Sequence, residues 1–463
     1  MKYLDNEDTI VALSTPLGKG AIAIIRLSGK ECLPIVNQIF SNEISAADHK
    51  RVFFGAINSL NENKLIDQVV VSYFRGPSSY TGEDVIEISC HCNVLIIDQI
   101  IREILHFSAR MANPGEFTER AFFNHKMDLS QAEAVAGIIG AKTQRSLSQS
   151  LKQLDGKLSQ KIREIKQETI NLLSLIEVNL DFNEEDIQVY EKSDLMTRAR
   201  KMATEVENLM RTYEYGKLLG EGIKMVILGK PNVGKSSLLN AFLEKERAIV
   251  SDIPGTTRDY IEGRMEIDGI PVQVVDTAGV RQTMDPVEEL GVKKAVEHID
   301  SADILLALFE SHSALDNDDK RMLEYVSQTR GKVAAVLVLN KTDLGEHPGV
   351  FEQLKKLDLP IVGVSAKFEE NIDKLRELIK TNLLKDSGVE DEEVVVINSR
   401  HKNALARAME SLKGFIADLE VDMDEVILAS ELRNVLDSIG QIIGETTTED
   451  LLNNIFGQFC IGK

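Results

Sequence analysis

A glycine-rich segment that ends in a lysine and a serine, Gly229–Ser236 (GKPNVGKS), constrains the fold of this chain more than any other feature. It fits the pattern GxxxxGK[ST], in which backbone N–H groups surround phosphates. Its setting supports this interpretation, because the apolar run Ile223–Leu228 before it predicts a strand and Ser236–Leu243 predicts the start of a helix. We therefore expect a P-loop in which Lys235 bridges the β- and γ-phosphates and the Ser236 hydroxyl ligates Mg²⁺.

Three further motifs follow in the order of a guanine-nucleotide-binding domain. Asp276–Gly279 (DTAG) ends the next apolar strand, where an aspartate holds Mg²⁺ through water and a glycine frees an N–H for the γ-phosphate. Asn340–Asp343 (NKTD) ends another strand, and the Asp343 carboxylate can accept both the N1–H and the exocyclic amine of guanine, a donor pair that adenine lacks. Ser365–Lys367 (SAK) follows the last strand and supplies backbone contacts to the base. Because α/β sheets bind ligands at the carboxyl ends of their strands, these motifs predict a domain that binds GTP.

Together with the loop Ser251–Thr257, these motifs define the expected GTP-binding residues. They are Asn232, Val233, Gly234, Lys235, Ser236, Ser237, Ser251, Asp252, Ile253, Pro254, Gly255, Thr256, Thr257, Asp276, Thr277, Ala278, Gly279, Asn340, Lys341, Thr342, Asp343, Ser365, Ala366 and Lys367.

Two departures from a small signalling GTPase concern the attacking water and the charge on the phosphates. Val280 directly follows the second motif, where Ras-like proteins place the glutamine that orients the water. An apolar side chain cannot orient water, so another residue must. Asn232 lies within the P-loop, and its carbonyl, with backbone oxygens of Ser251–Thr257, could hold a monovalent cation where other GTPases use an arginine finger. The same residue could also serve only to shape its loop, and the sequence fits both interpretations.

The rest of the chain divides into segments of different character. Residues 1–117 predict a small α/β domain, residues 118–220 contain no proline and predict helices, residues 221–385 alternate strands and helices, and residues 386–463 predict helices again. The alternation over 221–385 predicts a parallel-rich, doubly wound sheet with helices on both faces. The simplest organisation is one helical domain into which this α/β domain is inserted, because insertion is easy when the ends of the inserted domain lie close together.

One stretch of the first helical segment has a marked helical period. Apolar residues recur at steps of three and four from Leu147 to Ile176, with Thr169 the only polar member, and predict one face of a long helix. Basic residues lie on its outer face. Such a charge run is typical of a solvated helix face, and an RNA-binding patch is the alternative interpretation.

Composition limits the partners and the compartment. The 463 residues include 53 Lys plus Arg and 74 Asp plus Glu, a net charge of −21, which argues against a broad, non-specific grip on nucleic acid. Contact with RNA must then be local or come through a partner. The chain has no apolar run of about 18 residues, which argues against a membrane span. Acidic residues stand near the start, where a signal peptide needs a basic flank. Four cysteines are too few for a disulfide framework. We therefore expect a cytoplasmic protein without a membrane span.

Four segments outside the GTP motifs resemble the MnmE/TrmE family of tRNA-modification GTPases. They are Asp8–Gly20 (DTIVALSTPLGKG), Tyr80–Asp84 (YTGED), Asn113–Phe122 (NPGEFTERAF) and Phe459–Lys463 (FCIGK). Many proteins share the GTP motifs, whereas the segments at the two ends are much more specific. The resemblance extends from one end of the chain to the other.

The resemblance implies a homodimer joined through its N-terminal α/β domains, with a Ras-like G domain inserted in a helical domain. It implies GTP hydrolysis with Mg²⁺, held by Ser236 and Thr257, and with K⁺, which makes the G domains dimerise. Glu288 matches the family's catalytic glutamate and would orient the attacking water through a bridging water, the task that Val280 cannot perform. The residues that match the K⁺ site are Asn232, Ser251, Ile253 and Thr256.

The resemblance also implies a folate site in the N-terminal domain for 5-formyl-tetrahydrofolate or a related one-carbon folate. The matching residues are Arg26, Glu87, Lys126 and Lys463. A pterin edge needs a carboxylate for its donors, and a glutamate tail needs cations. The chain departs from similar sequences at Cys90–Asn93 (CHCN instead of CHGG), where bulkier residues bear on the shape of this pocket. Cys460, in the tail, is a candidate redox group or nucleophile.

The function implied by the resemblance is that of a GTPase which acts with MnmG, an FAD-dependent partner, on certain tRNAs. The pair would modify carbon 5 of the wobble uridine, position 34, to 5-carboxymethylaminomethyl- or aminomethyl-uridine. One alternative is a ribosome-assembly GTPase of the Era/Der type, which has no modifying chemistry and usually adds a basic RNA-binding domain; the acidic helices of residues 386–463 disfavour it. Another is a folate enzyme with a regulatory G domain.

Overall fold

The computed structural model describes residues 8–61, 63–181, 190–247, 264–267, 269–276, 302–329, 332–384 and 395–463. Contacts between residues divide the chain into two compact units. The first unit comprises Met1–Ile139, Lys152–Ala199 and Glu410–Lys463, and the second comprises Gly140–Leu151 and Arg200–Met409. Among the described helices, none combines the length and the apolar character needed to cross a membrane.

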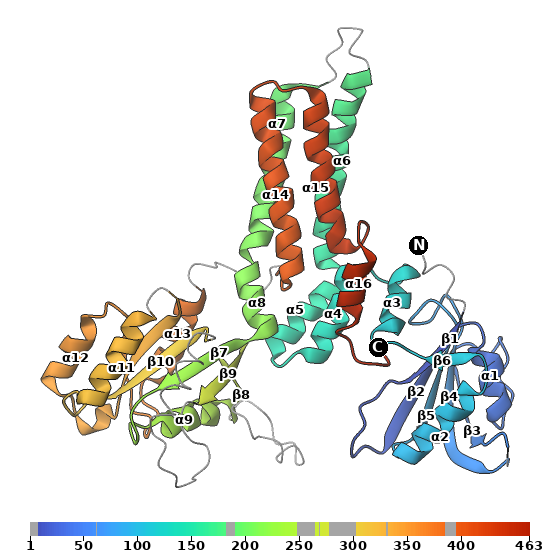
Figure 1. Ribbon diagram of the computed structural model, residues 1–463, viewed down its shortest axis with the longest axis horizontal. Coiled ribbons are helices and arrows are strands. Elements are labelled where there is room, and N and C mark those ends of the chain that lie inside the picture. Colours follow the sequence, from blue (N-terminus) through green and yellow to red (C-terminus); the bar gives the residue numbers. More distant parts are fainter. Residues whose placement is uncertain are drawn as a thin grey trace. The chain divides into compact units, whose positions relative to one another are not determined.

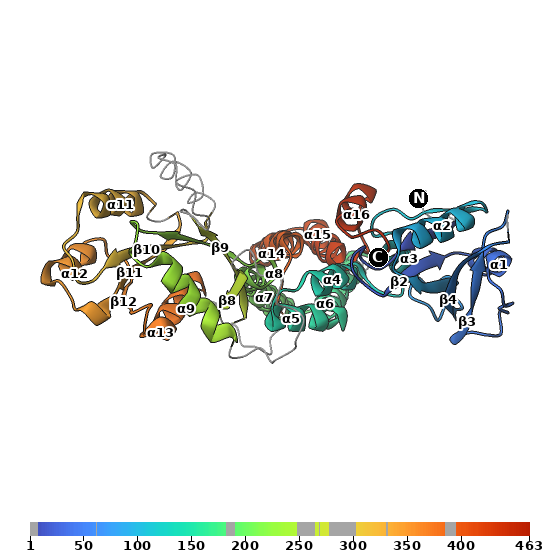
Figure 2. The same cartoon turned by 90° about the horizontal axis from the view of Figure 1, so that it is seen from below.

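The first unit contains a six-stranded sheet in the order β3-β4-β5-β2-β1-β6. Neighbouring strands are antiparallel except β1 and β6, which are parallel. Helices α1 (Cys32–Ile39) and α2 (Val94–Leu105) pack their apolar sides against one face of this sheet and form a shared core (Figure 2). The strands are β1 (Thr9–Leu13), β2 (Ile22–Ser28), β3 (Arg51–Asn58), β4 (Leu65–Phe74), β5 (Val85–His91) and β6 (Ala109–Met111).

Part of the opposite face of this sheet is open within the unit. Residues directly across from one another on neighbouring strands share a face, so Arg26 and Glu87 lie on the same side as Phe54. Ile22, Val52 and Phe54 on this side are 65%, 66% and 66% exposed. Three exposed apolar side chains therefore lie on the same sheet face as the Arg26–Glu87 pair.

The remainder of the first unit is helical. Helices α6 (Lys157–Asp181) and α15 (Glu425–Ile443) run side by side (Figure 1). Thr169, the polar residue on the apolar face of α6, is buried, and its hydroxyl donates to the Ile165 carbonyl at 2.8 Å. The other helices that lie wholly or partly in this unit are α3 (Glu116–Phe123), α4 (Leu129–Gly140), α5 (Gln144–Leu154), α7 (Lys192–Arg211), α14 (Ser399–Glu420) and α16 (Glu449–Phe456).

The prediction of one long helix from Leu147 to Ile176 is wrong. This stretch forms two helices, α5 (Gln144–Leu154) and α6, and they are separated at Gly156. Gly156 has a φ of +80°, a left-handed conformation that glycine adopts readily just after a helix. Because apolar residues continue at a four-residue step across the break, the periodicity did not reveal it. Leu151, predicted on the buried face, is 45% exposed.

The second unit contains another six-stranded sheet, in the order β12-β11-β10-β7-β9-β8. All its neighbouring strands are parallel except β8 and β9, which are antiparallel. The strands predicted beside the four motifs, which precede Gly229 and Ser365 and end at Asp276 and Asn340, are confirmed. The strands are β7 (Ile223–Leu228), β8 (Arg264–Ile267), β9 (Ile270–Asp276), β10 (Ile304–Glu310), β11 (Ala334–Asn340) and β12 (Ile361–Gly363).

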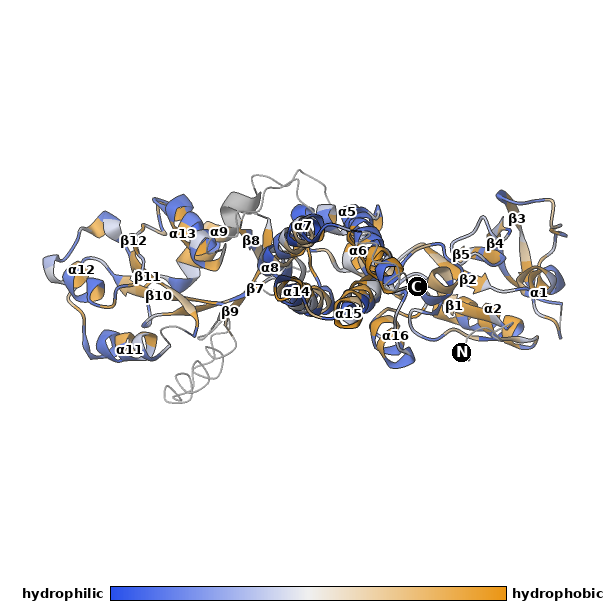
Figure 3. Ribbon diagram, turned by 90° about the horizontal axis from the view of Figure 1, so that it is seen from above, coloured by the Kyte–Doolittle hydropathy of each residue, from blue (hydrophilic) through white to orange (hydrophobic). Residues whose placement is uncertain are grey.

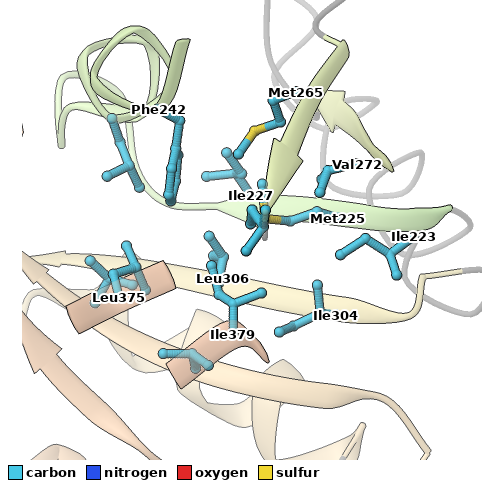
Figure 4. Packing of buried hydrophobic residues seen from close by; sticks show 14 of the residues in the cluster. Ile223, Met225, Ile227, Phe242, Met265, Val272, Ile304, Leu306, Leu375 and Ile379 are labelled. Atoms are coloured by element: carbon cyan, nitrogen blue, oxygen red, sulfur yellow. The ribbon is translucent and has the colours of Figure 1, made fainter. Parts of the chain in front are cut away.

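Helices cover both faces of this second sheet. On one face, Phe242 of α9 (Lys235–Arg247) and Ile379 of α13 (Ile372–Leu384) pack in a cluster with Ile227 and Leu306 (Figure 4). On the other face, α11 (Asn317–Gln328) and α12 (Pro348–Lys355) cover a second cluster of strand residues. These surface helices mix polar and apolar residues, as expected when one side is buried (Figure 3). The unit also contains α8 (Tyr213–Glu221) and the 3₁₀ turn η3 (Thr342–Leu344). The doubly wound arrangement follows directly from the alternation of strands and helices.

Candidate functional site

The predicted phosphate loop lies between β7 and α9, and Lys235 is the first residue of that helix. Asn232 and Gly234 have φ values of +62° and +101°, which turn the backbone tightly. Lys235 Nζ donates to the carbonyls of Gly229 and Lys230 at 2.6 Å and 3.0 Å, so the loop curves around its lysine. This is the turn that surrounds phosphates at a helix N-terminus.

Asn340 connects this loop to the segment predicted to bind the base. Its side chain is only 2% exposed, donates from Nδ2 to the Val233 carbonyl at 2.8 Å, and accepts at Oδ1 from the Ala366 N–H at 3.0 Å. A Cβ atom on Gly234 would lie 2.2 Å from Asn340 Nδ2, so only glycine fits there. The first, third and fourth motifs therefore meet at one buried amide.

Asp343 is exposed and has a fixed orientation. The Ser365 hydroxyl, on a fully buried side chain, donates to Asp343 Oδ1 at 2.6 Å. A carboxylate held in this way presents its acceptors in one direction, as required to pair with two donors on one edge of guanine.

A cluster of charged side chains lies at the carboxyl end of β10. Lys230 Nζ is 3.0 Å from Asp316 Oδ2, 3.1 Å from Asp319 Oδ2 and 3.8 Å from Glu310 Oε2. Glu310 Oε1 also accepts from Lys341 Nζ at 2.5 Å. None of these three carboxylates, nor Lys230, was predicted to belong to the site. For Glu310, the available signal was its position as an acid directly after the wholly apolar run of residues 304–309.

Several predicted residues lie outside the described part of the chain. These are the loop Ser251–Thr257, the Thr277–Gly279 part of the second motif, Val280 and Glu288. Asp276, the last residue of β9, is paired with Ile227 in the sheet. Ser236 and Ser237 are exposed in the first turn of α9, where Ser236 is open to a metal ion.

In the first unit, the structure brings three of the predicted folate residues to one place. Arg26 Nε and Nη2 lie 2.9 Å and 2.8 Å from Glu87 Oε1, and Arg26 Nη1 donates to the Gly462 carbonyl at 3.3 Å. Lys463 is adjacent, and its backbone oxygen accepts from the Phe117 N–H at 3.2 Å. The Arg26 guanidinium also lies 5.4 Å and 5.7 Å from the ring centres of Tyr80 and Phe117, neither of which was predicted as a site residue. The tail thus docks on the strand that carries Arg26.

Lys126 is not brought to this group by any described contact. Its Nζ donates to the Pro77 carbonyl at 2.9 Å. Cys460 is exposed. At the CHCN departure, Asn93 accepts from the Leu95 N–H and caps α2, and Cys92 Sγ lies 3.5 Å from the Gly18 carbonyl. The two bulkier residues therefore have local structural contacts of their own.

Comparison with known proteins gives matches along almost the whole chain. Residues 129–460 match the model of the MnmE helical domain, and residues 9–126 match that of the GTP-binding protein TrmE N-terminus. Three relatives are each named tRNA modification GTPase MnmE. They come from Natranaerobius thermophilus (40% identical over 461 residues, 99% of this chain and 100% of that one), Carboxydothermus hydrogenoformans (41% over 463 residues, 99% and 100%) and Clostridioides difficile (42% over 462 residues, 99% and 99%). Among solved structures, the FeoB G-domain from Methanococcus jannaschii is 25% identical, covers 35% of this chain and 98% of that one, and has a TM-score of 0.26.

Proposed function

Because the chain belongs to the MnmE family of tRNA-modification GTPases, we propose that it hydrolyses GTP in the loop around Lys235 as a step in the modification of tRNA. Asn340 gives the strongest structural support, because its buried amide bonds both Val233 of the phosphate loop and Ala366 beside the expected base. Asp343, held by Ser365, supplies the carboxylate that selects guanine.

The modification acts on carbon 5 of the wobble uridine, with MnmG as the FAD-dependent partner and a one-carbon folate as the source of the added carbon. GTP hydrolysis in this scheme orders and releases loops around the γ-phosphate and does not itself transfer carbon. The G domain is inserted between the two helical segments. The net charge of −21 agrees with a division of labour in which the partner makes most of the contact with tRNA.

Complementation of a strain that lacks the gene tests this function. We expect the wild-type chain to restore carbon-5 modification of wobble uridine, measured by mass spectrometry of tRNA nucleosides, and Lys235→Ala to fail. Lys374→Ala, which removes an exposed lysine of α13, is the matched control and should restore modification. Normal modification in the strain without the gene would contradict the proposal.

Two metal ions support hydrolysis in the proposed site. Ser236 and Thr257 would hold Mg²⁺, and Ser236 fits because it is an exposed residue in the first turn of α9. Asn232, Ser251, Ile253 and Thr256 surround K⁺, of which Asn232 is described, exposed on its tight turn. K⁺ would supply positive charge beside the phosphates, where no arginine finger is predicted.

Replacing K⁺ with Na⁺ should slow GTP turnover at least about tenfold, equivalent to about 1.4 kcal/mol. Equal rates with the two ions would contradict the assignment of the K⁺ site.

Glu288 is the proposed catalytic residue because it matches the family's glutamate. A group that acts only in the transition state changes turnover and not ground-state binding. Glu288→Ala should therefore lower kcat while GTP affinity stays nearly the same. A variant that instead binds GTP weakly would show that the residue has another role.

The proposed folate site includes Arg26, Glu87, Lys126 and Lys463, and the residues present fit such a ligand. Both contacts that Arg26 makes with Glu87 go to Oε1, and Glu87 Oε2 accepts no hydrogen bond from a described residue, so this oxygen can accept from a pterin edge. Tyr80 and Phe117 add aromatic surface beside the guanidinium. Glu87→Gln should weaken binding of 5-formyl-tetrahydrofolate measured by calorimetry, whereas Glu43→Gln, at an exposed site, should not.

The open face of the first sheet supports the proposed homodimer. Ile22, Val52 and Phe54 expose apolar side chains there, and apolar side chains gathered on one open sheet face are typical of an interface. Phe54→Glu should shift the sedimentation coefficient towards that of a monomer. Val421→Glu, at a 69% exposed position at the end of α14, is the control, and an equal effect of both variants would contradict this interface.

A further inference from the structure

The charged cluster at the carboxyl end of β10 connects the two ends of the proposed GTP site, and hydrolysis itself makes no use of it. Glu310, the last residue of β10, is the centre of this cluster. Its Oε1 accepts from Lys341, which belongs to the base-binding motif, at 2.5 Å. Its Oε2 lies 3.8 Å from Lys230, which belongs to the phosphate loop. One carboxylate thus contacts both segments that hold the nucleotide.

Lys230 is also fixed from its other side by α11. Asp316 and Asp319 form a capping box at the start of that helix, which sets the positions of both carboxylates. Each lies close to Lys230 Nζ, at 3.0 Å and 3.1 Å. With three carboxylates within 4 Å, the Lys230 ammonium belongs to this cluster, whereas Lys235 Nζ bonds carbonyls within the loop. The two lysines of the phosphate loop therefore have different tasks.

Within this cluster Glu310 and Asp316 are ionised at neutral pH, and the Glu310 and Lys230 side chains are largely shielded from water. Burial acts to raise the pKa of Glu310, but bonds from Lys341 and Ser313 outweigh it and hold this pKa below its usual value. The backbone N–H of Asp319, together with Lys230, lowers the pKa of Asp316 to about 2. The Glu310 and Lys230 side chains are each 16% exposed. Removing one partner from such a half-buried group leaves the others with uncompensated charge.

We propose that Glu310 is a positioning residue for guanine nucleotides, because it holds Lys341 and Lys230 in a fixed relation and so sets the distance between the base-binding and phosphate-binding segments. This role rests on the placement of GTP proposed above. It concerns the base and the phosphates that GTP and GDP share, so it affects the binding of both nucleotides. It does not involve the attacking water, so it leaves turnover at saturation unchanged.

The first test is Glu310→Gln, which keeps the shape and removes the charge. We expect Kd for fluorescent methylanthraniloyl-GDP and for GTP to rise about tenfold, with kcat within about twofold of wild type. The control is Glu352→Gln, which removes an equal charge from an exposed site on α12 and should leave both Kd values unchanged. Unchanged Kd in Glu310→Gln, or a fall in kcat as large as the rise in Kd, would overturn the proposal.

A double-mutant cycle separates this role from a general contribution to stability. Lys341→Met should raise Kd by itself, and adding Glu310→Gln to it should raise Kd little further, because the ion pair is already gone. The second unit of nucleotide-free Glu310→Gln should still unfold well above the assay temperature, so that a loss of stability does not account for the rise in Kd. Additive effects on Kd would overturn the proposal, as would a loss of affinity that follows the loss of stability.

Two further variants keep the test decisive. If Glu310→Gln does not fold, Lys230→Met tests the same connection from the phosphate loop, and it too should weaken GDP and GTP by similar factors. An unchanged Kd in that variant would overturn the proposal. Asp343→Asn reports separately on the proposed GTP site: if it changes base preference while Glu310→Gln has no effect, only the role of Glu310 fails.

Discussion

At the scale of single residues, buried hydrogen bonds define the nucleotide site more sharply than the motifs do. The sequence places Asn340 and Asp343 in one motif, but the structure gives them different surroundings. Asn340 is buried and bonds two loops, whereas Asp343 is exposed and is oriented by Ser365. The first residue therefore organises the site, and the second remains available to the base.

Asp343→Asn should shift base preference from guanine towards xanthine. An amide cannot accept from both donors of guanine, but its NH₂ group can donate to the carbonyl that xanthine has in place of the exocyclic amine. Competition between GTP and XTP for binding measures the shift. An unaltered preference would argue against the base-binding role of Asp343.

Glu119 of α3 predicts a pH-dependent stability in the first unit. Burial, followed by the negative charge of Glu116, raises its pKa to about 7. The folded state then holds a proton that the unfolded chain releases near pH 4.5, so stability falls as pH rises between these values. Glu119→Gln removes this loss. After allowance for solvent screening, it should stabilise the protein by about 1 kcal/mol at pH 8 and by much less at pH 5.

Thermal midpoints of wild type and Glu119→Gln at the two pH values test this expectation. Glu43→Gln, at an exposed position of the same unit, serves as the control. The difference in thermal midpoint between this variant and wild type should be the same at pH 5 and pH 8. A stabilisation by Glu119→Gln that is equal at both pH values would contradict the role of ionisation.

At the scale of elements, the backbone of the C-terminal tail holds it on the first sheet. Gly462 has a φ of +93°, and a Cβ atom there would lie 2.2 Å from the Leu13 carbonyl oxygen. Gly115, which precedes α3, has a φ of +71°, and a Cβ atom there would lie 2.5 Å from the Phe456 carbonyl oxygen. Close backbone approach at two points thus determines where Cys460 is presented.

Gly462→Ala should release the tail from the first sheet. An L side chain at this φ is strained, and its Cβ would overlap a carbonyl that belongs to a strand. Hydrogen exchange of the Phe117 amide, which donates to Lys463, should become markedly faster. Gly140→Ala, at a glycine with open space around it, is the control, and equal exchange in all three proteins would contradict this account.

At the scale of the whole molecule, the chain divides into two compact units, each with a buried apolar cluster of its own, which predicts two thermal transitions. GDP with Mg²⁺ binds only the second unit in the proposed function, so it should raise one midpoint and leave the other unchanged. At a concentration of about 100 times Kd the stabilisation is about 2.7 kcal/mol. Calorimetry with and without GDP measures this, and Asp343→Asn should abolish the shift. A shift of both transitions together would show that the units unfold as one.

The sequence predicted features that depend on neighbouring residues and missed those that depend on distant ones. The apolar run of β7 and the glycines of the phosphate loop carry their own signals, and both were predicted correctly. The break at Gly156 had only a weak signal because the apolar spacing passes through it. The bond from Arg26 to Gly462 joins residues 436 positions apart, and the contacts of Glu310 arise only when two loops meet. Local patterns cannot specify either of them.

The amide of Asn340 has a consequence for how a nucleotide leaves. Since the same side chain bonds the turn proposed to hold the phosphates and the loop proposed to face the base, loosening one of them would disturb the other. After hydrolysis, the phosphates of the nucleotide would then not detach while the base stays bound, and the base would not detach while the phosphates stay bound. Departure would be a single concerted event, and its rate would depend on how often this one buried contact breaks.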